Sequence, residues 1–169
     1  LRPLAIALHR LNHLLVWSGM LALLVASIVL TYSVFARHVM QASTDWQDEA
    51  AVFCIVGATF LSCAYVQSLR GHVGIEALAS WLSPTLNRLR LVLIDALSLA
   101  FCIFFSWKSW ALFHEAWTEG QTTSSTWAPP LWIPYALMAV GMTLLSVQLA
   151  MQLCTRANSV RLAMGKESA

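Results

Sequence analysis

Ionisable and aromatic residues gather at the two ends of one long apolar run, Ala50–Leu69. They are Trp46, Asp48 and Glu49 before the run, and Arg70, His72 and Glu76 after it. Residues of these types could form a catalytic cluster, or they could be an aromatic-belt residue, acids at a helix start and basic anchors at a membrane surface. The run itself is uncharged over about 20 residues, the length that crosses the roughly 30 Å core of a bilayer. We therefore expect the two groups at opposite faces of a membrane, where they cannot form one site.

Asp95 is an ionisable residue inside another apolar stretch, and such residues often belong to ion or proton pathways. One hypothesis is a coupling site in a self-contained four-helix proton-coupled exporter. Asp95 follows Arg90 by about one and a half helical turns, so it is expected close to the membrane surface. We favour the alternative, a structural hydrogen bond or a pair between subunits. Lys108 lies about 20 Å further along the same helix and is too distant to be the partner.

Histidines and cysteines are the residue types that would hold a haem or a metal ion. The five histidines are His9, His13, His38, His72 and His114. A haem held between two helices needs histidines at matching depth in the membrane, and we expect these five at the membrane surfaces. The four cysteines, Cys54, Cys63, Cys102 and Cys154, lie in apolar runs without a C-x-x-C pair, as is typical of small buried apolar side chains. We expect no cofactor and no metal, with a haem-bearing electron-transfer subunit as the alternative.

The composition is that of a membrane protein. Hydrophobic residues make up 59% of the 169 residues, and charged residues only 11%. The mean hydropathy is +0.67. Soluble domains carry about 25% charged residues, so this chain has too little polar surface to coat a soluble globule. The net charge of +2, with no basic cluster, also argues against nucleic acid as a partner.

The apolar runs predict an all-α integral membrane protein with one membrane domain over residues 1–169. Four transmembrane helices are expected at about 14–36, 46–69, 88–113 and 132–154. The first run is longer than the apolar region of a signal peptide, about 7–15 residues, so we expect it to be retained as a span. Ser43 or Thr44 is expected to cap the second helix.

The connection between the second and third spans contains an amphipathic segment. Ile75, Leu78 and Leu82 recur at helical spacing, and Ser83-Pro84 then predicts the start of the next helix. A short interfacial helix over about residues 73–82, lying in the plane of the membrane, accounts for this pattern.

The charges outside the apolar runs alternate in sign along the chain. The N-terminal segment, the connection 70–90 and the C-terminal tail each sum to +2, and the other two connections each sum to −2. Positively charged segments stay on the cytoplasmic side of a membrane. We therefore expect both termini and the connection 70–90 to be cytoplasmic.

The order of these motifs resembles that of a known family. Arg37 closes the first span, Trp46-x-x-Glu49 opens the second, and Arg70-Gly71-His72-Val73-x-Ile75-Glu76 follows it. Pro129-Pro130-Leu131-Trp132-Ile133-Pro134 leads into the fourth span. Together these features resemble the small membrane subunit, of DctQ type, of the tripartite ATP-independent periplasmic (TRAP) transporters. The resemblance covers essentially the whole chain.

The resemblance implies a non-enzymatic role as a small scaffold, or stator, subunit in a bacterial inner membrane. The family's large membrane subunit (M type) contains the substrate and sodium sites and moves as an elevator. A periplasmic substrate-binding protein (P type) delivers a carboxylate or similar organic anion. The chain would then support sodium-driven import without a substrate site of its own.

The resemblance also suggests structural or interface roles for particular residues. These residues are Arg37, Trp46, Asp48, Glu49, Arg70, Gly71, His72, Glu76 and Asp95. We expect Arg37, Asp48 and Glu49 to stabilise the outer ends of the first two spans, within the chain or against the large subunit. We expect Arg70, His72 and Glu76 to hold the interfacial segment near membrane lipid headgroups.

Overall fold

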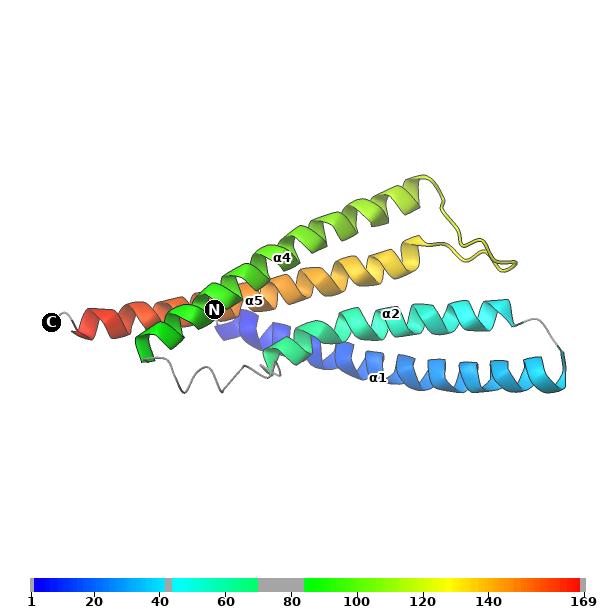
Figure 1. Ribbon diagram of the computed structural model, residues 1–169, viewed down its shortest axis with the longest axis horizontal. Coiled ribbons are helices and arrows are strands. Elements are labelled where there is room, and N and C mark those ends of the chain that lie inside the picture. The colour runs from blue at the N-terminus through cyan, green and yellow to red at the C-terminus, as the bar shows by residue number, and fades with distance from the viewer. Residues whose placement is uncertain (1, 42–43, 70–83, 168–169) are drawn as a thin grey trace.

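The computed structural model describes residues 2–41, 44–69 and 84–167, which form four α-helices (Figure 1). The helices are α1 (Arg2–Val39), α2 (Asp45–Ser68), α4 (Pro84–Thr118) and α5 (Trp132–Glu167). Apart from one isolated β-bridge between Thr122 and Pro130, the regular structure of these residues is helical. The prediction of an all-α fold is confirmed.

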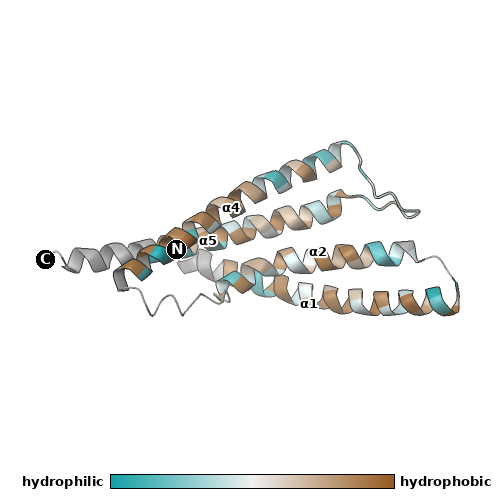
Figure 2. Ribbon diagram, viewed as in Figure 1, coloured by the Kyte–Doolittle hydropathy of each residue, from teal (hydrophilic) through white to brown (hydrophobic). Residues whose placement is uncertain are grey.

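All four helices are long and apolar enough to cross a membrane. Their apolar segments are Leu8–Val39, Trp46–Ser68, Leu89–Thr118 and Trp132–Arg156. Figure 2 shows hydrophobic residues along most of each helix, with hydrophilic ones more frequent towards the ends. The chain is therefore a multi-pass membrane protein with four spans, as the sequence predicts. The expected interfacial helix over residues 73–82 lies outside the described residues, and the orientation of the termini stays a prediction.

The helices form two antiparallel hairpins, α1–α2 and α4–α5, which meet where α2 packs against α5. In Figure 1, α1 and α4 flank this central pair. We call the end of the bundle near both chain termini the terminal end. The opposite end, with the connections around residues 40–44 and 119–131, is the loop end. The contact between α2 and α5 is therefore the main junction between the two halves of the protein.

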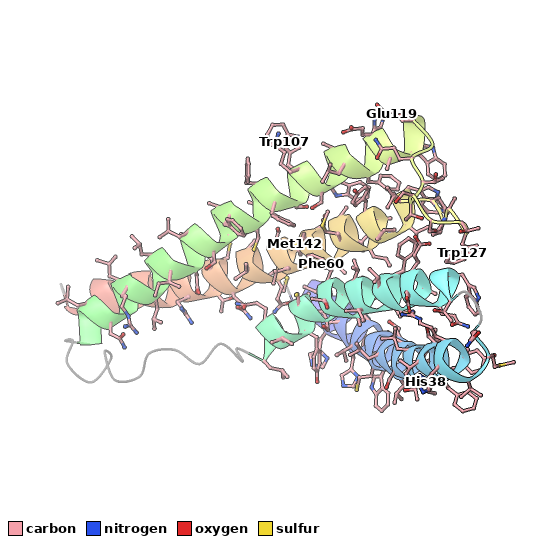
Figure 3. All side chains as sticks on the ribbon, turned by 45° about the vertical axis from the view of Figure 1, so that its right-hand side comes forward. His38, Phe60, Trp107, Glu119, Trp127 and Met142 are labelled. Atoms are coloured by element: carbon pink, nitrogen blue, oxygen red, sulfur yellow. The ribbon has the colours of Figure 1, made fainter. Side chains whose placement is uncertain are left out.

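Small residues let the helix backbones approach closely, as is common where helices pack within lipid. The most deeply buried apolar side chains are mainly alanines: Ala26, Ala36, Ala51, Ala58, Ala64, Ala116 and Ala139. Gly19 of α1 faces Ala58 of α2, and Gly141 of α5 lies against the backbone of Phe60 in α2. Apolar side chains fill the space between the helices at the centre of the bundle, where Figure 3 shows Phe60 beside Met142.

Large apolar side chains instead point outward from the bundle. Trp107 on α4 is 67% exposed and is directed away from the other helices in Figure 3. Leu97 and Phe101 on the same helix and Leu24 and Ile28 on α1 are similarly exposed. In a membrane protein such faces lie against lipid or a partner subunit, because both are apolar surroundings.

Substituting Gly141 with alanine is expected to destabilise the bundle. The added methyl group would overlap the carbonyl group of Phe60, whose carbon lies 2.6 Å from the position of the new Cβ. Overpacking of this kind typically costs about 1–3 kcal/mol. Thermal unfolding of the detergent-solubilised protein should show a lower midpoint for Gly141→Ala than for the unmodified chain.

Gly19→Ala is the matched control for this prediction. Its new Cβ would lie 3.4 Å from Cα of Ala58, an ordinary van der Waals contact. The substitution brings the same gain in helix propensity as Gly141→Ala. Equal unfolding midpoints for the two variants would contradict the proposed close approach at Gly141.

Candidate functional site

A polar cluster joins α1 and α2 at the loop end. Nη2 of Arg37 lies 2.7 Å from Oδ2 of Asp48, forming an ion pair. Asp48 also accepts a hydrogen bond from the Ser33 hydroxyl at 3.1 Å, and Arg37 donates to Oγ1 of Thr44 from both Nε and Nη2. Ser33 and Arg37 lie one turn apart on α1, so one face of this helix supplies both donors to Asp48. The cluster fastens the end of α1 to the start of α2.

Thr44 occupies the N-cap position of α2, as the sequence predicts, but its side chain makes no capping hydrogen bond. Its hydroxyl oxygen instead accepts from Arg37, at 2.8 Å from Nη2. The backbone carbonyl of Thr44 still accepts from the N–H groups of Gln47 and Asp48. The expected side-chain cap is therefore wrong, because the charged donor on α1 uses the hydroxyl oxygen.

Trp46 and Glu49 lie beside this cluster in different surroundings. The Trp46 ring is about half exposed and packs edge-on against Trp127, with ring centroids 6.4 Å apart. This contact joins the start of α2 to the connection between α4 and α5, and Figure 3 shows Trp127 near this end of α2. Glu49 is partly buried, and its Oε2 atom makes no hydrogen bond to the described residues.

The connection between α4 and α5 is folded back on itself by backbone hydrogen bonds. The N–H of Leu131 donates to the carbonyl of Gln121 at 2.9 Å, and the N–H of Thr123 donates to Pro129 at 3.1 Å. Gly120 starts the connection with φ +62°, a conformation that glycine adopts without strain. These bonds give the segment defined backbone contacts, although glycine, serine and threonine dominate residues 120–126.

Amide side chains join α2 to α5 towards the terminal end. Nε2 of Gln67 donates to Oε1 of Gln152 at 2.8 Å, and Nε2 of Gln152 donates to the backbone carbonyl of Gln67 at 2.9 Å. Asn12 of α1 is fully buried and donates to Oε1 of Gln148 at 3.4 Å. These three contacts link α5 to both helices of the other hairpin.

Asp95 pairs with Arg156, which joins α4 to α5. Nη1 of Arg156 lies 2.8 Å from Oδ2 of Asp95, a distance typical of an ion pair. The Oδ2 atom does not accept a well-aligned hydrogen bond. The same nitrogen donates to the backbone carbonyl of Leu91 at 3.3 Å. Asp95 thus faces a cation within the same chain. The structural hydrogen bond or pair between subunits that the sequence suggests for Asp95 stays a prediction.

The remaining residues of the sequence motifs, Arg70, Gly71, His72 and Glu76, lie outside the described residues. Their proposed role at the membrane surface stays a prediction. Among the described residues, no group of three histidine, cysteine, aspartate or glutamate side chains gathers where it could hold a metal ion. Apart from Glu49, the polar residues described above make contacts between elements of the chain, and these contacts hold the bundle together.

Several of these contact residues were not singled out from the sequence: Asn12, Ser33, Gln67, Gly141, Gln148, Gln152 and Arg156. The amides had a recognisable signal, because Gln67, Gln148 and Gln152 are polar residues inside or next to apolar runs. In the sequence, Arg156 stands out only as one of the positive charges in the C-terminal tail. Its partner could not be inferred, because pairing depends on how α4 and α5 are aligned in space.

Fold and contacts together define an all-helical, multi-pass membrane protein whose polar groups tie its own helices to one another. A family model described as the DctQ component of tripartite ATP-independent periplasmic transporters matches residues 26–159. The chain therefore belongs to the DctQ family, and it is a small component of a TRAP transporter. This is a family of transporter components and not of enzymes. Among curated proteins, no individual sequence matches the chain.

A double-mutant cycle on Gln67 and Gln152 should reveal their coupling. Either Gln→Leu substitution alone leaves the other amide without its side-chain partner, whereas the double substitution replaces both with apolar groups. The expected coupling energy is about 1 kcal/mol, the scale of polar contacts between membrane helices. Unfolding free energies measured in detergent provide the four values. Gln67→Leu combined with Thr143→Val is the control, and its effects should add because Thr143 bonds to other partners.

The two ion pairs should differ in their importance for stability. The Asp95 and Arg156 side chains are 15% and 19% exposed, whereas Asp48 and Arg37 are 47% and 61% exposed. Asp95→Ala removes the carboxylate that faces a largely buried arginine and should cost about 3 kcal/mol. Asp48→Ala should cost no more than about 1 kcal/mol, because water and salt screen an exposed pair. Similar unfolding free energies for these two variants would contradict this assignment.

Proposed function

We propose that this protein is the fixed scaffold subunit of a sodium-driven TRAP transporter. In this role it supports the large membrane subunit, which carries the substrate and moves, and has no substrate site of its own. A periplasmic binding protein delivers the substrate, a carboxylate or similar organic anion. The complex resides in the inner membrane of a bacterium, with both termini of this chain in the cytoplasm.

The proposal rests on membership of the DctQ family and on the contacts that join the four helices of this chain to one another. Gly141 and Phe60 bring α2 and α5 into backbone contact, and Gln67 and Gln152 bond the same two helices further along. Ion pairs then fasten α1 to α2 and α4 to α5. A bundle with contacts of this kind resists sliding of one helix past another, which suits a stationary support.

The outer faces of α1 and α4 offer the surface that such a support needs. Leu24 and Ile28 on α1 and Phe101 and Trp107 on α4 are all exposed, and apolar. A large membrane subunit can pack on one such face while lipid covers the other, because neither contact requires polar groups. We infer that the large subunit binds through apolar helix faces and not through the Arg37–Asp48 pair, which is used within the chain.

Arg70, Gly71, His72 and Glu76 are proposed to hold the connection between α2 and α4 at the cytoplasmic membrane surface. Basic residues next to a span are attracted to anionic headgroups, and the glycine permits a tight turn out of the helix. A segment held in this way would keep the scaffold level while the large subunit moves.

The geometry does not favour the two alternatives. A proton-coupled exporter would need a carboxylate that binds and releases a cation, whereas Asp95 is paired with Arg156. A haem between helices would need facing histidines, and His38 and His114 lie on α1 and α4, the two flanking helices of Figure 1. The scaffold role is therefore the function that the contacts support best.

Reconstitution with the other two components tests the proposed function. This chain should co-purify with the large subunit, and proteoliposomes that contain both should take up a radiolabelled carboxylate when the binding protein and a sodium gradient are present. Proteoliposomes that contain only this chain should show no uptake above empty vesicles. Transport by this chain alone would overturn the scaffold proposal.

The same assay tests the motif after α2. Arg70→Ala, His72→Ala and Glu76→Ala should each reduce complex formation or uptake, while Lys108→Ala, whose side chain lies over the neighbouring Trp107 ring, is the charge-removal control. Unchanged assembly and uptake in all three motif variants would remove their proposed role.

A further inference from the structure

A groove opens between α4 and α5 at the terminal end of the bundle. It encloses about 670 Å³ and is lined by α4, α5 and the end of α2. Arg90, Asp95 and Arg156 lie at one part of its wall. The wall also includes the amides of Gln67 and Gln152, and apolar residues such as Phe101, Leu145 and Leu149. The groove therefore has a charged end and an apolar end, as an amphipathic ligand would require.

The charged end of the groove carries an excess of positive charge. Asp95 is engaged by Arg156 at 2.8 Å, so the arginines outnumber the carboxylate. The Arg90 side chain makes no ion pair or hydrogen bond with the described residues, and its Nε atom is shielded from solvent. A guanidinium group in such a place favours an anion that accepts hydrogen bonds, and phosphate oxygens fit its planar donor geometry.

The apolar end extends the groove towards the middle of the membrane. Arg90 and Phe101 lie on the same helix, and the rise between them is roughly 16 Å for eleven residues of an α-helix. This length accommodates most of a fatty acyl chain. Leu97, Ile94 and Leu149 supply apolar walls along it.

We propose that this groove binds one anionic phospholipid, with its phosphate at Arg90 and an acyl chain along α4 towards Phe101. Basic pockets between transmembrane helices are known to hold anionic headgroups. The order of the wall residues, charged near the membrane surface and apolar further in, matches the order of groups in a phospholipid. A protein segment would have to supply an acidic group followed by an apolar stretch at the same depth, so a lipid is the simpler occupant. The proposal does not depend on the transport role.

Native mass spectrometry of the full chain in detergent tests the site, with phosphatidylglycerol as the probe. One phosphatidylglycerol should bind more tightly than phosphatidylcholine, and glycerol 1-phosphate should not compete, because it lacks the acyl chains. Arg90→Gln should weaken phosphatidylglycerol binding about tenfold, the loss expected for a charged hydrogen bond. Arg10→Gln removes the same charge from an exposed residue near the same end and should leave binding unchanged.

A second variant tests the apolar part without altering any charge. Ser98 lines the groove, and Ser98→Trp should fill it and weaken lipid binding, whereas Leu93→Trp on the exposed side of the same helix should not. Equal binding of phosphatidylglycerol and phosphatidylcholine would overturn the proposal. Undiminished binding by a folded Arg90→Gln variant would also overturn it. So would a photo-crosslinker at Ser98 that, in the assembled complex, labels the large subunit and no lipid.

Discussion

The close contact between Gly141 of α5 and the backbone of Phe60 in α2 holds the two halves of the protein together. Each hairpin has its own internal packing, but α2 and α5 form the broad interface between the hairpins. Inside a bilayer the hydrophobic effect does little to bring helices together, because lipid chains are as apolar as leucine. Close backbone approach and buried polar bonds must supply the attraction. This contact and the Gln67–Gln152 hydrogen bonds determine how the two hairpins lie against each other.

The polar contacts between helices differ in charge and in exposure to solvent. The exposed pair Arg37–Asp48 lies at a helix end, where water can reach it and its contribution to stability is small. The Asp95–Arg156 pair is more buried, so each charge depends strongly on the other. Between these extremes, Gln67 and Gln152 form hydrogen bonds between helices without any buried charge. Together the contacts constrain both ends of the bundle.

A bundle of this construction suits a component that stays in place while another moves. The charged and amide side chains described above mainly contact other helices of the same chain. The outer faces are broad and apolar, as Trp107 on α4 illustrates. Membership of the DctQ family assigns the chain to a tripartite transporter. The lipid proposed beside Arg90 would fill the groove between α4 and α5 at the membrane surface.

The sequence by itself determined the class of protein, the four spans and the family, because these depend on the length of apolar runs and on the order of local motifs. It also indicated Asp95 as a residue in need of a partner. Only the tertiary structure identified that partner as Arg156, placed the Thr44 hydroxyl on Arg37, and brought Gly141 against Phe60. Such pairs join residues far apart in the chain, and their distances depend on the rotation and offset of packed helices. No local pattern specifies that alignment, because any apolar helix face can satisfy a lipid environment.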